Sequence, residues 1–374
     1  MSDIKLVKST QKIAIFLASL QGGGAERSML RLANSWAERG LNVDLVLTQK
    51  DGAYLSDISP KLKLINLETS RVILSLPKLI AYLKQEQPTS LLCALNYVNL
   101  VALWAKFCSG VSTQVIVTVR NTLSQERKIS DQQKKHLMHR LIYRFYPWAD
   151  EIVAVSRGVA DDLAKTAKLP RERIKVIYNP TFTPNILLQA KATLDHPWFS
   201  DTEQPVILAA GRLTQQKDFP TLIKAFAIAQ QHYCARLMIL GEGEERCPLE
   251  ALVKELGLED RVSLPGFVKN PFAYMAQAAL FVLSSAWEGF ANVLVEAMAV
   301  GTPVVSTNCP SGPEEILEQG KYGQLVPVGD VEKLAIAMVT TLQNPQSSED
   351  LQHRAMDFSM ENSVNQYLAL LNQK

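Results

Sequence analysis

Residues 12–40 have the sequence KIAIFLASLQGGGAERSMLRLANSWAERG, and this stretch decides the fold. It begins with an apolar, β-branched run over 12–18, which is typical of a strand buried on both faces. Three glycines follow at Gly22, Gly23 and Gly24, and a helical pattern then continues to Gly40. A buried strand, a glycine-rich turn and a helix are how a parallel α/β unit begins, so we expect that architecture.

The same pattern recurs in both halves of the chain. Further short apolar runs, each followed by a helical pattern, occupy 43–48, 90–95, 114–119 and 151–155 in the first half. The second half has candidate strands near 206–210, 236–240, 280–284 and 303–306. Its candidate helices lie at about 219–232, 247–256, 292–300, 313–319 and 331–343. Strands that lack polar alternation and are spaced by helices predict parallel sheets covered on both faces.

This pattern predicts an α/β protein of two doubly wound, Rossmann-like domains. The least periodic stretch, 178–205, is rich in turn residues and marks the boundary. We therefore expect domains at 1–180 and 181–374, with a final helix at about 357–374 that packs back on the first domain. Ligands of open α/β sheets bind beyond the carboxyl ends of the strands, so we expect the two domains to face a central cleft.

Composition supports a globular protein and shows an uneven distribution of charge. The 374 residues are 47% hydrophobic and 20% charged, which is typical of folded domains and disfavours disorder or a fibrous repeat. Residues 1–180 carry 26 Lys and Arg against 15 Asp and Glu, whereas 181–374 carry 13 against 22. Either the two halves have different partners, or their surface compositions have drifted apart.

Three weaker signals in the sequence indicate the cellular compartment of the protein. There is no apolar run of 18 residues, so we expect no membrane span. The first twelve residues, MSDIKLVKSTQK, are polar and lack the apolar core of a secretory signal. The five cysteines are scattered without metal-binding spacing. We therefore expect a cytoplasmic protein.

The three glycines after the first strand are more than a tight turn needs. They let the backbone approach a ligand closely and leave helix amides free to face an anion. Their spacing is not that of the GxGxxG dinucleotide motif, which disfavours a nicotinamide-dependent oxidoreductase.

Two cations mark the loop after the strand at 206–210. Arg212 and Lys217 follow Gly211 and could hold and neutralise a diphosphate leaving group, although a solvated loop with two ordinary charges is the simpler interpretation. Weaker candidates are Glu242, Gly243 and Val268, which follow the next strands, where backbone groups can contact a base.

The strongest local signal is SSAWEGFANVLVEAM, at 284–298. Glu288 lies in a glycine-containing loop and Glu296 lies in the helix that follows, so two carboxylates straddle a helix N-terminus that favours anions. One could reach a sugar ring and the other a ribose. Neither has a Lys or Arg four residues on, which argues against a simple surface ion pair.

Taken in order, these segments resemble glycosyltransferase family 4, which contains retaining enzymes of the GT-B fold. The matching segments are GGGAER, VSRGVADDL, IYNP, GRLTQQKDF, GEGEER, GF, EGFANVLVEAMA, GTPVV and SGPEEI. The resemblance implies that Arg212 and Lys217 bind the donor diphosphate. It also implies that Glu288 contacts the donor sugar and Glu296 the ribose hydroxyls.

Further donor contacts follow from the same resemblance. It implies backbone amides directed at the sugar and phosphate from Gly289, Phe290, Ala291, Asn292 and Val293. The GEGEER and GF loops, with Glu242, Gly243 and Val268, would surround the nucleobase, and Gly22 to Gly24 would close over the diphosphate. The choice of UDP over GDP rests on the resemblance alone.

The expected chemistry needs neither a metal nor a cofactor. No Asp-x-Asp follows a strand, and the cations and the helix N-terminus supply positive charge instead. Without a convincing nucleophile, a retaining transfer favours front-face attack, in which the departing phosphate oxygen takes the proton of the acceptor.

One departure from the family concerns the loop after 114–119. Many relatives place a His there, whereas this chain has Arg120 and Asn121 and no His until His136. We therefore assign no catalytic base and expect Arg120 or Asn121 to line the acceptor side.

The basic charge of the first half concentrates between Arg120 and Trp148. Lys134, Lys135, Arg140 and Arg144 accompany Trp148 and apolar residues at helical spacing, which fits a helix on an anionic membrane surface. The alternative is an ordinary helix whose apolar stripe packs on its own sheet. No nucleic-acid-binding module is found, so we expect no nucleic-acid partner.

The sequence thus predicts a retaining glycosyltransferase, peripheral on the inner face of the cell membrane. It would move a hexose or N-acetylhexosamine from a UDP-sugar to a lipid-linked glycan in cell-surface polysaccharide biosynthesis. Such an acceptor would be a polyprenyl-diphosphate oligosaccharide or a lipopolysaccharide core. The alternatives are a transferase with a soluble acceptor and a non-catalytic nucleotide-sugar- or glycan-binding protein of the same fold.

Overall fold

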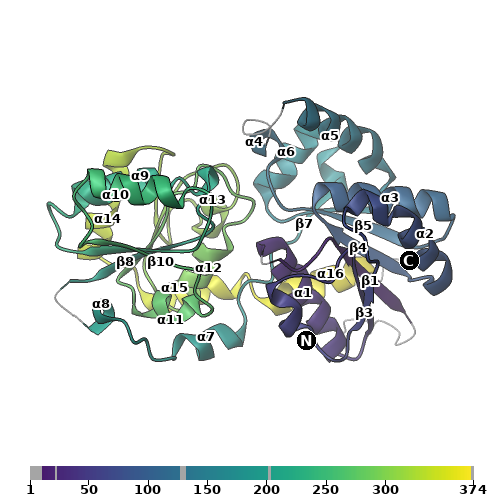
Figure 1. Cartoon of the computed structure of the whole chain (residues 1–374), viewed down its shortest axis with the longest axis horizontal. Coiled ribbons are helices and arrows are strands. Elements are labelled where there is room, and N and C mark those ends of the chain that lie inside the picture. The colour runs from purple at the N-terminus through teal and green to yellow at the C-terminus, as the bar shows by residue number, and fades with distance from the viewer. Residues whose placement is uncertain (1–10, 22, 127–131, 201–203, 372–374) are drawn as a thin grey trace. The chain divides into compact units, whose positions relative to one another are not determined.

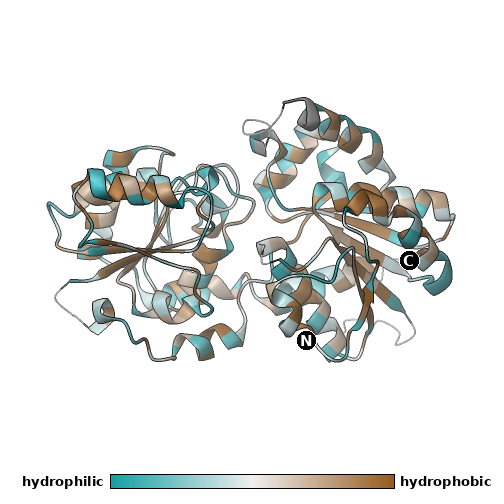
Figure 2. Cartoon of the chain, in the orientation of Figure 1, coloured by the Kyte–Doolittle hydropathy of each residue, from teal (hydrophilic) through white to brown (hydrophobic). Residues whose placement is uncertain are grey.

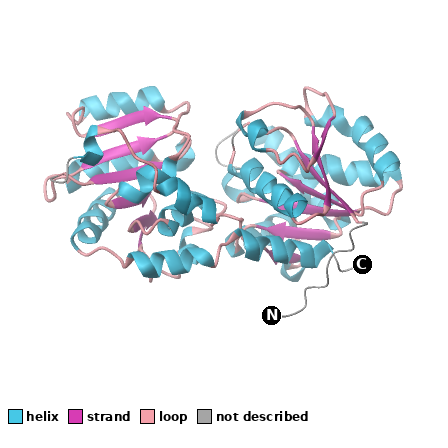
Figure 3. Cartoon of the chain, turned by 90° about the horizontal axis from the view of Figure 1, so that it is seen from below, coloured by secondary structure: helices cyan, strands magenta, loops and turns pink. Residues whose placement is uncertain are grey.

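The computed structural model describes residues 11–21, 23–126, 132–200 and 204–371, and these form two compact α/β units (Figure 1). The first unit runs to Pro180 and also includes the chain from Met360 onward. The second unit is Thr181–Ser359. In each unit helices flank a parallel sheet (Figure 3), which confirms the predicted fold class of two parallel-sheet α/β domains.

The sheet of the first unit has seven parallel strands among the described residues, in the order β3-β2-β1-β4-β5-β6-β7. Its strands are β1 (Lys12–Leu17), β2 (Asn42–Leu47), β3 (Lys63–Asn66), β4 (Ser90–Ala94), β5 (Gln114–Val119), β6 (Glu151–Ala154) and β7 (Ile174–Val176). The inner strands β4 and β5 are buried along their whole length, as their continuous apolar runs predict. The carboxyl ends of all these strands therefore lie along one edge.

Helices and short 3-10 segments connect these strands. The helices are α1 (Gly24–Glu38), α2 (Leu76–Glu86), α3 (Asn96–Ser109), α4 (Leu123–Glu126), α5 (Gln132–Phe145), α6 (Arg157–Ala167) and α16 (Met360–Leu371). The 3-10 segments are η1 (Ala53–Asp57), η2 (Val72–Ser75), η3 (Tyr146–Trp148) and η4 (Arg171–Arg173). Helix α3 packs against both α2 and α5, which places these three helices in one layer.

The last helix, α16, is part of the core of the first unit. Its Val364, Tyr367 and Leu368 are buried in the same apolar cluster as Trp36 of α1. The Trp36 and Tyr367 rings meet edge to face with their centroids 6.4 Å apart, a favourable aromatic geometry. Because of this burial, the final helix completes a sheet face formed by residues far away in the sequence.

The sheet of the second unit has the order β10-β9-β8-β11-β12-β13, again parallel among the described residues. Its strands are β8 (Val206–Ala210), β9 (Arg236–Leu240), β10 (Val262–Gly266), β11 (Leu280–Leu283), β12 (Val304–Thr307) and β13 (Gln324–Val326). The strands are its most hydrophobic elements (Figure 2). Buried apolar side chains of β8, β9 and β11 join those of the neighbouring helices in one core.

Helices cover both faces of this second sheet (Figure 1). They are α7 (Pro184–Ala190), α8 (Pro197–Ser200), α9 (Phe219–Ala229), α10 (Arg246–Glu255), α11 (Pro271–Gln277), α12 (Asn292–Ala299), α13 (Pro313–Ile316), α14 (Val331–Gln343) and α15 (Ser348–Met356), with the 3-10 segment η5 (Gln215–Lys217). Helices α9, α10 and α14 lie on one face, and α11, α12 and α15 lie on the other.

Four strands escaped the sequence-based prediction, and all four lie at sheet edges. They are β3, β7, β10 and β13. Edge strands are short and half covered, so they lack the continuous apolar run that identifies a central strand. The predicted helix at 313–319 is also shorter than expected. It ends at Ile316, and Glu318 and Gln319 have φ angles of 48° and 58°.

None of the helices within the described ranges is both long enough and apolar enough to cross a membrane.

Candidate functional site

The candidate site of the second unit lies where the strand order reverses. Strand β8 lies between β9 and β11, so the loops that leave the carboxyl ends of β8 and β11 diverge at this point. Such a switch point is where ligands of open α/β sheets bind. The loop after β8 carries Arg212 and Lys217, and the loop after β11 carries Glu288.

Lys217 and Glu288 form a buried ion pair across these two loops. Lys217 Nζ donates to Glu288 Oε1 at 2.5 Å, and Ser285 Oγ donates to the same oxygen at 2.7 Å. The side chains are 15% and 9% exposed. Such low exposure weakens screening by water, so the pair is stronger than a surface ion pair. Two residues that the sequence singled out separately are thus brought together.

Further hydrogen bonds hold the two loops in register. Ser284 Oγ donates to the Lys217 carbonyl at 2.7 Å, and the Ala286 amide donates to the Gln216 carbonyl at 2.8 Å. Gln216 Nε2 donates to the Trp287 carbonyl at 2.9 Å. The backbone that carries Lys217 is therefore fixed before any ligand binds, which is the condition for effective electrostatic stabilisation.

Glycines allow the loops after β8 and β9 to approach closely. A Cβ atom on Gly211 would lie 2.9 Å from Cε of Lys217. Gly241 has a φ of +137°, and a Cβ there would lie 1.9 Å from the Gly211 carbonyl oxygen. A Cβ on Gly243 would lie 2.2 Å from the Leu213 carbonyl oxygen. Larger residues at 241 and 243 would force the two loops apart, and one at 211 would displace the Lys217 side chain.

Glu242 is held beside the end of β10. Its Oε1 accepts from Arg246 Nη1 at 2.8 Å, and Arg246 Nη2 donates to the Leu264 carbonyl at 2.8 Å. Val268 lies just beyond β10 and is half-buried. Its neighbour Phe267, the second residue of the GF segment, leaves an aromatic ring 71% exposed. An exposed ring in this loop offers a stacking surface that a planar ligand could use.

The N-terminus of α12 lies next to the ion pair. Its N-cap residue, Ala291, has a φ of 45° and no side chain that could accept from the helix amides. Phe290 is buried against Phe358, with the ring centroids 5.3 Å apart. Gly289 is also buried, whereas Asn292 and Val293 are half-buried. Anions are favoured at such a helix end.

Two other predicted residues, Glu296 and Arg212, have clear positions. Glu296 lies on α12 and is only 1% exposed. Arg212 is exposed, and no described group forms a hydrogen bond or ion pair with its guanidinium. Cys309, which the sequence did not indicate, is a buried neighbour of Glu288. Burial raises the pKa of its thiol, and the Glu288 carboxylate raises it further.

At the carboxyl edge of the first unit, the glycine loop already faces an acid. Gly23 is the N-cap of α1, and a Cβ atom on it would lie 2.1 Å from Glu26 Oε2. The Glu26 carboxylate therefore lies over the helix end that the sequence predicts as an anion site, where the helix dipole favours it. Gly24 begins the helix and is exposed, and Gly22 lies outside the described residues.

Arg120 follows β5 at this same edge. Its Nη1 donates to Asn179 Oδ1 at 2.8 Å, whereas its Nε and Nη2 are shielded from water and have no hydrogen-bond partner among the described residues. Burial lowers the pKa of the guanidinium, and the nearby Tyr367 and Glu26 oppose that shift. Asn121, next in the chain, is half-buried. Two shielded N–H donors without partners can bind an acceptor oxygen or an anion.

Sequence reasoning missed Glu26, Tyr97, Asn179 and Tyr367 as part of this edge. Tyr97 follows the carboxyl end of β4, which was predicted, so its position after a strand was an available signal. Asn179 follows β7, which the sequence did not reveal, so it had no such signal. Glu26 was visible in the first turn of a helix. Tyr367 had no local signal, because α16 reaches this edge only through tertiary packing.

The apolar residues of α5, the predicted membrane helix, are partly buried and partly exposed. Ile142 is fully buried, whereas Leu137 is 58% exposed. Arg140 is exposed, and the Arg144 guanidinium lies over the Trp148 ring, 5.5 Å from its centroid. The side chains of Lys134 and Lys135 lie outside the described part of the chain. Membrane contact stays a prediction.

Comparison with known proteins gives two family matches along the chain. Residues 22–182 match the family described as "Glycosyltransferase Family 4", and residues 191–358 match "Glycosyl transferases group 1". The first match covers most of the β1–β7 unit, and the second covers the loops that carry Arg212, Lys217 and Glu288.

Curated relatives match almost the whole chain. The N-acetylgalactosamine-N,N'-diacetylbacillosaminyl-diphospho-undecaprenol 4-alpha-N-acetylgalactosaminyltransferase of Campylobacter jejuni is 30% identical and aligns with 92% of this chain and 94% of its own. The lipopolysaccharide core biosynthesis glycosyltransferase LpsE of Rhizobium meliloti is also 30% identical, over 94% of this chain and 96% of its own. A solved structure of Anabaena HepE in complex with UDP-glucose superposes with a TM-score of 0.78 at 23% identity, covering 96% and 98% of the two chains.

Proposed function

The chain belongs to the glycosyltransferases of the GT-B fold, with a family 4 domain followed by a group 1 domain, and from this premise we propose its reaction. We infer that it is a retaining enzyme that moves a hexose or N-acetylhexosamine from a UDP-sugar to a lipid-linked glycan. The observation that carries this proposal is the Lys217–Glu288 pair at the switch point of the second sheet. Arg212, which has no ion-pair partner among the described residues, lies on the loop that carries Lys217.

Lys217 and Arg212 supply positive charge for the donor diphosphate. An ammonium has three N–H donors, so Lys217 can keep its hydrogen bond to Glu288 and donate to a phosphate oxygen at the same time. Glu288 and the α12 N-terminus then lie on the side of the donor sugar. Glu296, eight residues further on, is assigned to the ribose hydroxyls.

UDP is the proposed nucleotide. Support comes from HepE, which shares the fold and whose structure was solved with UDP-glucose. The exposed ring of Phe267 and the loop after β9, with Gly241 and Gly243, are suited to a planar base.

The proposed transfer follows front-face attack. The bond between the anomeric carbon and the phosphate oxygen breaks, and the acceptor hydroxyl oxygen bonds to that carbon from the same face. The acceptor proton passes to the departing phosphate oxygen. The cations of the loop after β8 stabilise the negative charge that develops on the leaving group, so we propose that the reaction needs neither a metal nor a cofactor.

The acceptor is assigned to the carboxyl edge of the first unit. The two 30% identical relatives are named for transfer to a diphospho-undecaprenol glycan and for lipopolysaccharide core biosynthesis, which supports a lipid-linked acceptor of cell-surface polysaccharide. We assign to this acceptor the Nε and Nη2 groups of Arg120, which have no hydrogen-bond partner in the described part of the chain, and Asn121 beside them. We place the protein at the inner face of the cell membrane, with Arg140, Arg144 and Trp148 toward anionic lipid.

A transfer assay tests this proposal. Purified protein in EDTA is incubated with a panel of UDP-hexoses and UDP-N-acetylhexosamines and with undecaprenyl-diphosphate-linked sugars. The anomeric configuration of any product is then determined by NMR. We expect one UDP-sugar to be transferred with retention. An inverted product would refute the mechanism, and transfer only to water-soluble sugars would refute the acceptor.

A further inference from the structure

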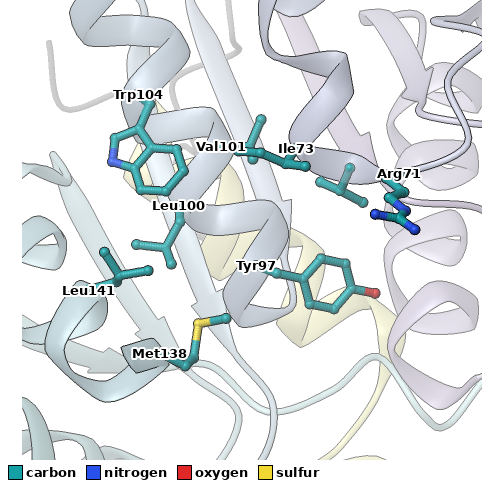
Figure 4. Close-up of a pocket in the computed structure, with 9 residues that line it drawn as sticks. Arg71, Ile73, Tyr97, Leu100, Val101, Trp104, Met138 and Leu141 are labelled. Carbon is teal, nitrogen blue, oxygen red and sulfur yellow. The ribbon is translucent and has the colours of Figure 1, made fainter. Parts of the chain in front are cut away.

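An apolar groove runs along one face of helix α3 in the first unit (Figure 4). It has a volume of about 420 Å³, within the range of roughly 300–1,000 Å³ typical of small-molecule sites. Side chains from η2, α3 and α5 form its walls, among them Ile73, Leu100, Trp104, Met138 and Leu141. No residue proposed to bind the donor contributes to it, so it is a separate feature.

The groove runs parallel to one face of helix α3. Tyr97, Leu100 and Trp104 are spaced three and four residues apart, so they lie on one face of the helix and span about 10 Å. Tyr97 lies in the first turn of α3, three residues beyond the carboxyl end of β4. Partial burial raises the pKa of its hydroxyl, and the negative charge of Glu26 adds to the shift. The groove therefore starts beside the edge that holds Glu26 and leads away from it.

The two ends of the groove differ in polarity. Figure 4 shows Arg71 and the Tyr97 hydroxyl together at one end, with Trp104 and Leu141 at the other. Arg71 is exposed, and no described residue forms a hydrogen bond or ion pair with its guanidinium. A cation and a hydroxyl at one end of an apolar channel complement a molecule with an anionic head and an apolar tail.

Large apolar side chains are exposed to solvent at the rim of the groove. Ile73 is 50% exposed although it lines the groove, and its neighbour Leu74 is 56% exposed. Leu137, next to the lining residue Met138, is also exposed. Clustered exposed apolar side chains of this kind mark binding sites.

We propose that this groove binds the first isoprenoid units of a polyprenyl-diphosphate acceptor, with the diphosphate at Arg71 and Tyr97. The inference rests on the proposed function and adds a tail-binding site to it. The apolar lining along one face of α3 suits a branched hydrocarbon chain. With the diphosphate at the Tyr97 end, the attached sugar lies at the carboxyl edge of the sheet, where Arg120 is.

Binding of farnesyl diphosphate, measured by titration calorimetry, tests the groove without any turnover. Inorganic diphosphate provides the head without the tail. In Ile73→Glu and Met138→Glu, an acid at the groove should weaken farnesyl diphosphate binding at least tenfold, about 1.4 kcal/mol. Ile336→Glu is the matched control, because Ile336 is 64% exposed on α14 of the second unit. It should bind like the unchanged protein, and Arg71→Gln should weaken binding of farnesyl diphosphate.

Three results would overturn the proposal. The first is equal affinity for farnesyl diphosphate and inorganic diphosphate. The second is unchanged affinity in both groove variants, with circular dichroism used to show that each variant is folded. The third is a pattern in which the protein binds phosphatidylglycerol vesicles and Ile73→Glu abolishes this binding, while farnesyl diphosphate neither binds the protein nor competes with the vesicles. That pattern would make the groove a contact with the bilayer. Absence of sugar transfer, by contrast, would count against the proposed function and not against the groove.

Discussion

Replacing Lys217 with Met separates two properties of the buried pair, namely its part in folding and its part in catalysis. The substitution keeps most of the length of the side chain and removes its charge. Glu288 is then left 7% exposed, and among the described residues Ser285 Oγ is the side-chain donor that remains to its carboxylate. Removing one partner of a buried ion pair costs about 3–5 kcal/mol, and the residual exposure of both side chains favours the lower end of that range.

The expected loss of stability can be measured by thermal unfolding. At about 2–4 °C per kcal/mol for a unit of this size, a loss of about 3 kcal/mol lowers the melting temperature of the second unit by about 6–12 °C. The double variant Lys217→Met with Glu288→Gln should recover most of this loss, because it removes the unpaired buried charge. A single Lys217→Met change that alters melting by less than 2 °C would refute the buried-pair interpretation.

Catalysis should respond differently from stability. Loss of one preorganised electrostatic contact costs about 2.7–4 kcal/mol, so kcat should fall roughly 10²–10³-fold in Lys217→Met. The double variant should regain stability and stay inactive, because the leaving group is still without this cation. Initial rates at saturating donor, at a temperature where each variant is folded, provide the measurement. Turnover within tenfold of the unchanged protein would refute the assigned role of Lys217.

Three other predictions concern separate parts of the molecule. Glu296→Gln should weaken UDP binding at least tenfold, about 1.4 kcal/mol, while leaving acceptor KM unchanged; unchanged UDP affinity in calorimetry would contradict the ribose contact. Arg120→Ala should raise the KM for a lipid-linked acceptor and leave UDP affinity intact, and the opposite pattern would move Arg120 to the donor side. Hydrogen bonds from Lys12 and Lys63 lower the pKa of Glu86 to about 2 from 4.5, so its stabilisation is complete above pH 4.5 and is lost as pH falls toward 2. Glu86→Gln should therefore flatten the acid-unfolding curve between those values, and a curve of unchanged slope would show that these contacts add nothing.

The fold was largely accessible from the sequence because its central strands are buried on both faces. Strands β1, β4, β5, β8 and β11 have continuous apolar runs, and each was predicted to within two residues. The edge strands were missed because each pairs with a neighbour on one side only and lacks the continuous apolar run of a central strand. Strand β10, for example, contains Pro265 and ends at Gly266, which disguise it as a turn.

The candidate site could be predicted from the sequence only to the extent that residue type and position after a strand indicate a role. Arg212, Lys217 and Glu288 could be proposed because each follows a strand at its carboxyl end. The direct bond between Lys217 and Glu288 could not be found, since it depends on β8 and β11 being neighbours although 71 residues separate the pair. The groove on α3 was hidden for the same reason, because its walls come from three separate elements.

Calorimetric titration of the protein with UDP and with GDP, both in EDTA, tests the donor site most directly. We predict that UDP binds in the micromolar range without metal, that GDP binds at least tenfold more weakly, and that Lys217→Met weakens UDP binding. UDP binding that needs a divalent cation, or equal binding by the unchanged protein and Lys217→Met, would contradict a site built on the loops after β8 and β11.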